Sequence, residues 1–320
     1  MKKTLIAMVG VLWLALFPYS QVLAQEGSAG VPAMQARQVA PNVYYVEGLS
    51  ELGSSANQNF ISNAGFVVTP EGVVVIDALG SPELARRLIA QIRKVTDKPI
   101  NTVIVTHYHA DHVYGLQVFK GAGARIVAHE ASGEYLNSDT ARLRLEASRQ
   151  DLFPWVDENT KLVPPDAPIN GARKLVVGGV DFEIIPVGPS HMPDDLVVWL
   201  PQSRVLFAGD LVFRNRIPFV GQADSRQWIE SLNSLLKFPA KVMVPGHGPA
   251  STDPKQDMTL TRDYLMYLRQ TMGKGAAELL PFDEVYKSTD WRRFEKVPLF
   301  KAANRMNAYN TYLLMEREGQ

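Results

Sequence analysis

The sequence contains no cysteine. This absence excludes disulfides, thiol nucleophiles, thiolate metal ligands and iron–sulfur clusters, and it leaves no residue to which a lipoprotein anchor could be attached. Any metal site must therefore be built from histidine, aspartate and glutamate. A chain without cysteine is also compatible with an exported bacterial protein that folds without disulfides.

Charge of one sign is not in excess, because Lys plus Arg and Asp plus Glu both number 33. The balance argues against a nucleic-acid surface and against an acidic partner, and leaves a small-molecule substrate as the expected partner. A composition of 46% hydrophobic and 21% charged residues is typical of a soluble globular protein. A chain of 320 residues is long enough to bury a sizeable core.

Long hydrophobic runs are also missing. The apolar stretch that follows Lys2 and Lys3 is interrupted from Pro18 onward after roughly 16 residues, short of the ~20 needed to span a bilayer. Small residues around Ala24 match the pattern that a signal peptidase reads. We therefore predict that residues 1–24 are a signal peptide cleaved after Ala24, rather than an uncleaved membrane anchor, and that the protein is periplasmic.

The rest of the sequence indicates one mixed α/β domain with a helical tail. Residues 25–40 are small and polar, which favours a flexible leader. Residues 41–252, the predicted catalytic domain, hold short apolar runs closed by Gly or Pro, and two of these runs flank "TPEG" and predict a hairpin. Ser81 and Pro82 predict the start of a helix. Apolar stripes at a spacing of 3–4 predict helices in a C-terminal extension, residues 253–320, that packs on this domain.

Histidine is scarce, yet three of the six histidines lie within "HYHADH", residues 107–112. This segment follows a predicted buried strand, and α/β sheets present ligands at the C-terminal ends of their strands. His107 and His109 are two residues apart, so in an extended segment both point to the same side and can hold one ion. Asp111 and His112 cannot reach the same tetrahedral site, and a tight turn would direct them to a second ion.

Two further histidines and one aspartate occupy similar positions. His191 in "GPSHMPDD" and His247 in "PGHGP" each follow an apolar run, and Asp210 closes "VLFAGD" in the same way. Binding residues concentrate on such loops, so we predict that these three side chains join the metal site. His129 in "VAHEAS" also follows a strand, but it lacks a partner in a recognisable pattern and is predicted to be a core residue or to support a ligand.

This constellation resembles the metallo-β-lactamase superfamily. The resemblance runs from about Val43 to Ala250 and includes motifs in the family's order: Asp77 in "VVVIDALG", His107-x-His109-x-Asp111-His112, His191, Asp210 and His247. It implies an α/β fold of the αββα sandwich type, with the metals at one edge of two facing sheets.

The resemblance also implies a ligand set for two zinc ions. The first ion would be held by His107, His109 and His191, the second by Asp111, His112 and His247, and both by a bridging Asp210. Asp77 would support the metal loop without touching an ion. A hydroxide that bridges two zinc ions is available near neutral pH and attacks a carbonyl or phosphoryl group. Asp111 would orient this nucleophile and receive its proton, so the site is predicted to be hydrolytic.

Four local segments indicate which branch of the superfamily the sequence resembles most. The segments "GPSHMPDDLVVWLP", "VLFAGDLVF", "VPGHGP" and "ANRMNAYNTYLLME" are similar to exported zinc hydrolases associated with sulfur oxidation and with quinoprotein dehydrogenases. The ligand set also resembles that of glyoxalase II and of quorum-signal lactonases, whereas zinc β-lactamases with a cysteine ligand need it at the place of Asp210. We expect cleavage of an ester, lactone, thioester or amide bond, with β-lactams among the amides.

Three side chains are candidates for substrate binding. Arg214 and Arg216 follow Asp210 in "LVFRNR" and could pair with a substrate carboxylate or sulfonate, or else be solvated loop charges. Trp155 in "FPWVDE", residues 153–158, could belong to a flap over the substrate.

Alternatives from other functional classes stay open. A mononuclear Fe2+ enzyme of the persulfide dioxygenase type shares this fold and much of the ligand set, although a complete dinuclear set favours zinc. A metal-holding partner without catalysis would be indicated by the loss of a ligand, and none is lost. A nuclease is disfavoured by the neutral charge and the export signal.

Overall fold

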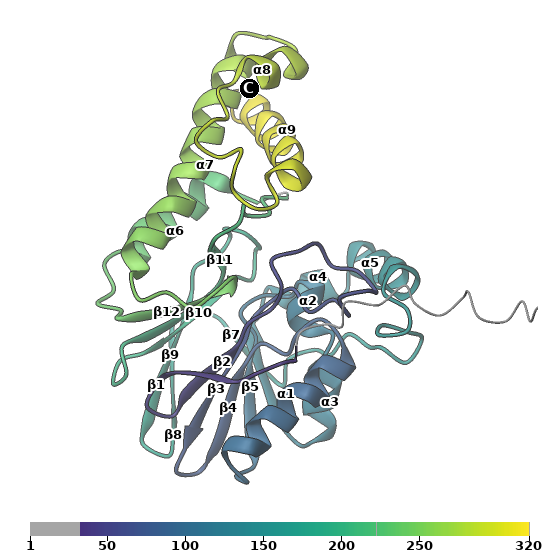
Figure 1. Cartoon of the computed structure of the whole chain (residues 1–320), viewed down its shortest axis with the longest axis vertical. Helices are drawn as coiled ribbons and strands as arrows, with labels where there is room; N and C mark the ends of the chain where they lie inside the picture. The colour runs from purple at the N-terminus through teal and green to yellow at the C-terminus, as the bar shows by residue number, and fades with distance from the viewer. Residues whose placement is uncertain (1–32, 222, 320) are drawn as a thin grey trace, which may run out of the picture. The chain divides into compact units, whose positions relative to one another are not determined.

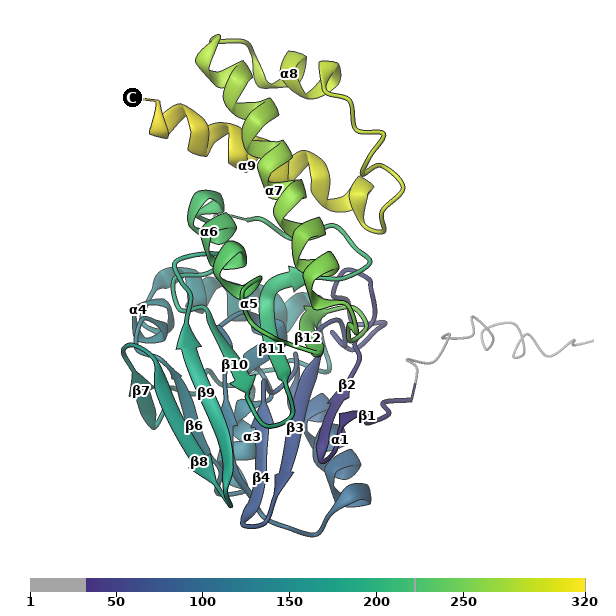
Figure 2. The same ribbon diagram turned by 90° about the vertical axis from the view of Figure 1, so that its left-hand side faces the viewer.

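The computed structural model describes residues 33–221 and 223–319. The predicted signal peptide and residues 25–32 of the expected leader lie outside these residues. The described residues form two β-sheets that face each other, with helices on the outer side of each sheet (Figures 1 and 2). The αββα sandwich predicted from the sequence is confirmed.

The first sheet contains seven strands in the order of the chain. They are β1 (Arg37–Ala40), β2 (Val43–Val46), β3 (Ala64–Thr69), β4 (Gly72–Ile76), β5 (Ile100–Ile104), β6 (Arg125–His129) and β7 (Ala167–Ile169). The first four strands pair antiparallel, and β4 to β7 pair parallel. The hairpin predicted around "TPEG" is β3–β4, and the strand predicted before the histidines is β5.

The second sheet contains five strands in the order β12-β11-β10-β9-β8. They are β8 (Arg173–Val177), β9 (Val180–Pro186), β10 (Leu196–Leu200), β11 (Val205–Phe213) and β12 (Val242–His247). All neighbours pair antiparallel except β11 and β12, which run parallel. The last two strands therefore end at the same edge of the sheet, and this is the edge to which Asp210 and His247 belong.

Burial on both faces of the sheets explains why the strand sequences are almost continuously apolar. Between the sheets, Val74 and Ile104 of the first sheet share one core with Val198 and Phe207 of the second. The opposite face of the first sheet packs against helix α1 through side chains such as Leu88. Apolar contact on both faces holds the two sheets and their helical layers together.

Helix α1 (Pro82–Val95) begins as the sequence predicts. The Ser81 side chain accepts a hydrogen bond from the backbone N–H of Leu84, and Pro82 occupies the first turn. The further helices before residue 253 are α2 (Ala110–Val113), α3 (Leu116–Gly121), α4 (Ser132–Leu136), α5 (Asp139–Asp151) and α6 (Ser225–Leu235).

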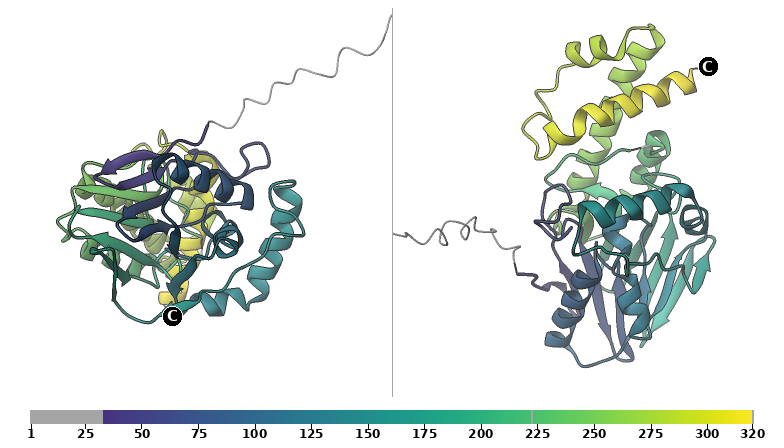
Figure 3. Two further views of the ribbon diagram at one scale, coloured as in Figure 1. Left: turned by 90° about the horizontal axis from the view of Figure 1, so that it is seen from below. Right: turned by 90° about the vertical axis from the view of Figure 1, so that its right-hand side faces the viewer.

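The C-terminal residues form α7 (Pro254–Ala277), α8 (Phe282–Ser288) and α9 (Phe300–Glu318). Helix α9 packs against α7 and crosses it, as Figure 2 and the right-hand view of Figure 3 show. Leu265 of α7 and Ala308 of α9 share a core with Trp228 of α6 and Leu206 of β11. We call residues 254–318, which contain α7, α8 and α9, the helical segment. Its core is thus continuous with that of the outer layer of the second sheet.

Two short strands differ from the sequence prediction. Arg37–Ala40, which falls within the expected flexible leader, is strand β1 and pairs antiparallel with β2. An edge strand tolerates polar side chains because only one side of its backbone is paired, and Arg37 forms an ion pair with Glu47. Strand β7 was not predicted because it has three residues with Pro168 at its centre, a residue that strands tolerate only at an edge.

Among residues 33–221 and 223–319, no helix has both the length and the apolar character needed to cross a membrane.

Candidate metal centre

The predicted metal donors converge at one edge of the two sheets. His107 and His109 follow β5, and Asp111 and His112 lie in α2, one turn further along the chain. His191 lies in the loop between β9 and β10. Asp210 lies within β11, and His247 is the last residue of β12. All except His109 and Asp111 are buried.

The first group of donors contains His107, His109, His191 and Asp210, whose ligand atoms all lie within 4.8 Å of one another. Nδ1 of His109 lies 3.1 Å from Nε2 of His107 and 3.0 Å from Nε2 of His191. Oδ2 of Asp210 lies 3.3 Å from Nε2 of His191. Three imidazoles and one carboxylate oxygen thus surround a common point.

The second group contains Asp111, His112 and His247. Oδ2 of Asp111 lies 3.6 Å from Nε2 of His112 and 3.3 Å from Nε2 of His247. The Asp210 carboxylate also reaches this group, because its Oδ1 lies 3.2 Å from Nε2 of His112 and its Oδ2 lies 3.2 Å from Nε2 of His247. Among the described residues, Asp210 is the one carboxylate with contacts to both groups.

These spacings match the coordination of small divalent cations. Four ligands at 2.0–2.1 Å from a tetrahedral zinc ion lie about 3.3 Å from one another, which is the spacing of most donor pairs here. Nε2 of His112 and Oδ1 of Asp210 lie buried 3.2 Å apart, and neither makes a hydrogen bond with any of the described residues. Bound cations would supply the missing partner for both atoms, so the residues present fit a metal centre.

Asp77 fixes the orientation of the segment that carries His107 and His112. Its Oδ1 accepts a hydrogen bond from the backbone N–H of Thr106 at 2.7 Å, and its Oδ2 accepts one from the Thr106 hydroxyl at 2.8 Å. Nδ1 of His112 lies 2.9 Å from the same Oδ2. A carboxylate can only accept, so the His112 proton is on Nδ1 and the Nε2 lone pair points to the second group.

The same logic applies to two other imidazoles. Nδ1 of His107 lies 3.1 Å from the Thr106 hydroxyl, whose proton is given to Asp77. Nδ1 of His247 lies 2.7 Å from the carbonyl oxygen of Ile61. Both Nδ1 atoms therefore donate, and both Nε2 atoms are left as acceptors that face the donor groups.

Burial and nearby charges shift the pKa values of the histidines in opposite directions. Burial lowers the pKa of His107 well below its usual range and lowers that of His109 to about 3. Both are neutral at pH 7, as metal ligation requires. For His112, burial also disfavours the charged form, but the carboxylates of Asp210, Asp111 and Asp77 raise its pKa well above the usual value. Without a cation, His112 therefore holds a proton where an ion would bind.

Glycine at position 246 makes room for the central carboxylate. A Cβ atom at Gly246 would lie 1.9 Å from Oδ1 of Asp210, closer than any two such atoms can approach. Only glycine lets β12 pass beside the Asp210 side chain in its present position.

The candidate substrate-binding residues have different surroundings. Arg214 pairs with Asp257 of α7 at 2.7 Å and is directed toward the helical segment. Arg216 is buried, with a guanidinium nitrogen 3.2 Å from Nδ1 of His247 and the guanidinium carbon 5.6 Å from the centre of the Phe213 ring. Because this Nδ1 donates to the carbonyl oxygen of Ile61, the first of these contacts brings two donors together and is not a hydrogen bond. Burial lowers the pKa of Arg216, but a guanidinium stays charged at neutral pH. Of the two arginine side chains, only that of Arg216 lies against a predicted metal ligand.

The remaining candidates lie away from the donors. The indole N–H of Trp155 donates to the carbonyl oxygen of Ser55 at 2.8 Å, which ties residues 153–158 to the loop before β3. His129, at the end of β6, accepts a hydrogen bond from the backbone N–H of Ala131 at 3.2 Å and belongs to neither donor group.

Two polar residues that the sequence analysis did not single out join the segments around the site. The Asn63 side chain donates to the carbonyl oxygens of Pro245 at 2.8 Å and Gly248 at 2.7 Å, which links β3 to the residues on both sides of His247. The Ser62 hydroxyl donates to the carbonyl oxygen of Asp111 at 2.5 Å. The only sequence signal for them is their position as polar residues directly before a buried strand.

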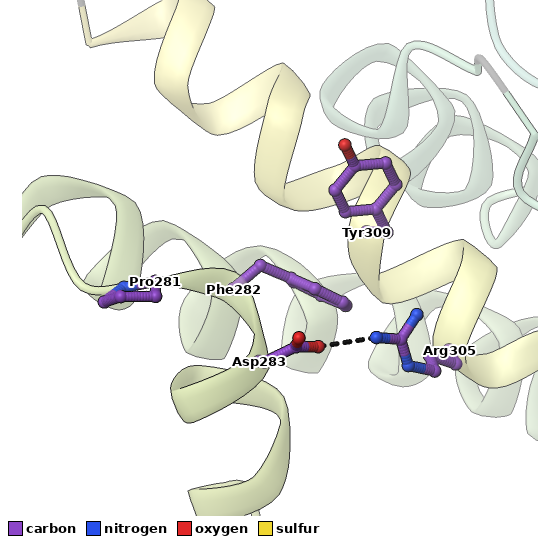
Figure 4. Close-up of a pocket in the computed structure, with 5 residues that line it drawn as sticks. All are labelled: Pro281, Phe282, Asp283, Arg305 and Tyr309. Atoms are coloured by element: carbon purple, nitrogen blue, oxygen red, sulfur yellow. Dashed lines mark hydrogen bonds and ion pairs between the residues drawn. The ribbon is translucent and has the colours of Figure 1, made fainter.

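An open groove of about 370 Å³ lies elsewhere, between α8 and α9. Phe282, Asp283, Arg305 and Tyr309 line it together with Pro281, and Asp283 pairs with Arg305 across it at 2.5 Å (Figure 4). None of the predicted site residues contributes to it, so it is separate from the metal centre.

Comparison with known proteins agrees with this architecture. Residues 58–247 match the sequence profile described as the metallo-beta-lactamase superfamily. A linear primary-alkylsulfatase from Pseudomonas sp. (strain ATCC 19151) is 29% identical over 241 residues, which cover 63% of this chain and 45% of the relative. A type 2 metallo-beta-lactamase from Bacillus cereus is 28% identical over 204 residues, which cover 62% of this chain and 72% of the relative.

Solved structures of metallo-beta-lactamases and of an alkylsulfatase share this fold. A metallo-beta-lactamase from Pontibacter korlensis superposes with a TM-score of 0.58 and 25% identity, and the match covers 73% of this chain and 99% of that one. A sec-alkylsulfatase from Pseudomonas sp. superposes with a TM-score of 0.70 over 88% of this chain and 50% of that one, and at 20% identity it shows the fold alone. The chain spans about half the length of the alkylsulfatases that it matches.

Proposed function

The chain belongs to the metallo-beta-lactamase superfamily, and from this premise we propose that it is a periplasmic hydrolase that holds two zinc ions. The bond that it cleaves belongs to an ester, lactone, thioester or amide, with β-lactams among the amides. The alkylsulfatase relatives add sulfate esters to these candidates. The export part of the proposal depends on the signal-peptide pattern of residues 1–24.

The observation that carries the proposal is the position of Asp210 between two sets of donors. Its Oδ2 lies 3.3 Å from Nε2 of His191 in the first set, and its Oδ1 lies 3.2 Å from Nε2 of His112 in the second. A carboxylate in this position would be shared by two cations, as dinuclear hydrolases require. The residues that would hold the ions are His107, His109 and His191 for one, Asp111, His112 and His247 for the other, and Asp210 for both.

Two bound zinc ions would supply Lewis acidity and an activated water molecule. The chain supplies orientation and a proton acceptor. The Asp111 side chain is 16% exposed, against 4% for Asp210, so Asp111 is the carboxylate that an incoming substrate meets. It is therefore the residue that orients the nucleophile and receives its proton.

Arg216 suits a substrate that carries an anionic group. Its guanidinium lies beside His247, and its Nε is buried without a hydrogen-bond partner among the described residues. A carboxylate, sulfonate or sulfate would satisfy that donor and pair with the charge. Arg214 is already paired with Asp257, and Trp155 is held by Ser55, so we assign substrate recognition to Arg216.

The test is metal analysis of protein from a periplasmic fraction, combined with a panel of substrates. The panel contains a chromogenic cephalosporin, a lactone, a thioester, an aryl ester and an alkyl sulfate. About two zinc ions per chain, with turnover of any member, is the expected result. About one iron ion without hydrolysis would refute the proposal and indicate a mononuclear iron oxygenase, which consumption of oxygen with a persulfide would test.

A further inference from the structure

The segment that follows β11, residues 214–221, lies beside His247 of the second donor group. We call it the β11 exit loop. Its first backbone N–H, that of Arg214, donates to the carbonyl oxygen of His247 at 3.0 Å. A Cβ atom at Gly248 would lie 2.1 Å from the Arg214 carbonyl oxygen, so the loop and the end of β12 are in close contact. This loop carries Arg216.

The helical segment holds the opposite side of the loop. The backbone N–H of Ile217 donates to the carbonyl oxygen of Pro298 at 2.9 Å. Asn307 of α9 makes two contacts with the loop backbone: its Oδ1 accepts from the N–H of Val220 at 2.9 Å, and its Nδ2 donates to the carbonyl oxygen of Pro218 at 2.7 Å. Figure 2 shows α7 and α9 on the side of the second sheet where β11 ends.

Asn307 is well suited to fix a backbone conformation. Its side chain is fully buried, and its amide also donates to the Tyr264 hydroxyl at 3.1 Å. A buried amide with satisfied hydrogen bonds in one geometry leaves the loop little freedom, because any other position of the loop would leave these buried groups unpaired. Pro218 and Val220, the two residues that Asn307 contacts, lie within four residues of Arg216 in the chain.

Asn304, one turn earlier in α9, provides an internal comparison. It is also fully buried, accepts from the Tyr264 hydroxyl at 2.8 Å and donates to the Tyr286 hydroxyl at 3.2 Å. All of these contacts stay within the helical segment. Of the two buried asparagines, Asn307 alone contacts the loop beside the metal centre.

We propose that Asn307 is a positioning residue, which holds the β11 exit loop so that Arg216 meets the anionic group of the substrate. This inference builds on the proposed hydrolase and makes the helical segment a part of its substrate site. The contacts that carry it are those of Asn307 with Pro218 and Val220 and that of Arg216 with His247.

The test compares Asn307→Ala with Asn304→Ala in the zinc-loaded, full-length protein. Hydrogen exchange is measured for residues 214–221, together with zinc content and the KM and kcat of two probes. The probes are a chromogenic cephalosporin, which carries a carboxylate, and 4-nitrophenyl acetate, which carries no charge. Asn307→Asp is the second variant, because it keeps the acceptor for Val220 but opposes the Pro218 carbonyl oxygen.

We expect faster exchange in residues 214–221 for both Asn307 variants, with unchanged zinc content. The KM for the cephalosporin should rise by about 10- to 100-fold, the range of one hydrogen bond to a charged group, while the KM for 4-nitrophenyl acetate stays constant. Asn304→Ala should lower the melting temperature without changing either the exchange of the loop or the KM values.

Equal effects of Asn304→Ala and Asn307→Ala on the loop would refute the inference, because the role of Asn307 would then be helix packing alone. In the wild-type protein, the Val220 amide should exchange as slowly as the buried amides of α9, and fast exchange would also refute it. If neither probe is turned over by the zinc-loaded wild type, the proposed hydrolase fails for these substrates, and the exchange measurements still decide whether Asn307 holds the loop.

Discussion

Replacing Asp77 with Asn tests whether a carboxylate outside the donor groups controls the second ion. Asp77 accepts from the backbone N–H and the hydroxyl of Thr106 and from Nδ1 of His112. In the variant, the amide oxygen satisfies the Thr106 N–H only when the amide NH2 faces His112. Nδ1 of His112 must then accept, and its proton moves to Nε2, the atom that faces the ion.

The size of the effect follows from these contacts. Loss of a residue that orients a metal-bound histidine lowers metal affinity by about 10- to 100-fold, or about 1.4–2.7 kcal/mol. Asp77→Asn keeps an acceptor for Thr106, so it should affect zinc affinity more than folding. Asp77→Ala leaves the Thr106 N–H and the His112 Nδ1–H unpaired, at about 1–3 kcal/mol each, and should lower the stability of the apoprotein by about 2–6 kcal/mol.

The assay combines zinc competition against a chromophoric chelator with urea unfolding of the metal-free protein. We expect Asp77→Asn to weaken the binding of the second zinc ion directly through His112, and to weaken that of the first ion to a smaller extent through the Thr106 hydroxyl that orients His107. If this variant binds both ions with wild-type affinity, the assignment of the His112 proton to Nδ1 is wrong.

Three further predictions follow from the geometry and the pKa values. Neighbouring carboxylates raise the pKa of His112, so zinc must displace a proton from this histidine when it binds. Zinc affinity should therefore fall as the pH is lowered. Calorimetry in buffers of different ionisation enthalpy should detect the released proton. Burial raises the pKa of Asp194 to about 6, so its ionisation destabilises the folded apoprotein as the pH rises from about 4 to about 6. Asp194→Asn should therefore stabilise the apoprotein by about 3 kcal/mol at pH 8 and by almost nothing at pH 4 in urea unfolding. Gly246→Ala should displace the Asp210 carboxylate, 1.9 Å from the added carbon, and lower the zinc content below two per chain in metal analysis. Gly133→Ala, where a Cβ meets no atom within 4 Å, should not lower it.

The sequence was sufficient to locate most of the strands and the segments that gather at the site, but not the order of the strands in the two sheets. The runs before "HYHADH" and "PGHGP" become β5 and β12, because buried strands need continuous apolar sequence, and their ends meet at one edge. Asp210 was predicted to close a strand but lies inside β11, where Gly209 with a φ of 51° interrupts the pairing with β12. A local pattern does not contain that irregularity, because it depends on the close approach of Thr106.

The orientation of each imidazole could not be predicted, because it depends on acceptors that are distant in the chain. His107 and His112 are neighbours in sequence, but the group that orients both is Asp77 with Thr106. His247 is oriented by the carbonyl oxygen of Ile61, a backbone atom without any sequence signature.

The same reasoning applies to the helical segment. The periodicity of α9 marks Asn307 only as one position of a helix, because nothing local shows that its amide meets the backbone of residues 218–220. Asparagine is a poor helix former, so its presence at a fully buried position of α9 requires a tertiary partner. The partners of the two buried amides of α9 differ: those of Asn304 are tyrosine hydroxyls, whereas those of Asn307 include the backbone that borders the candidate metal centre.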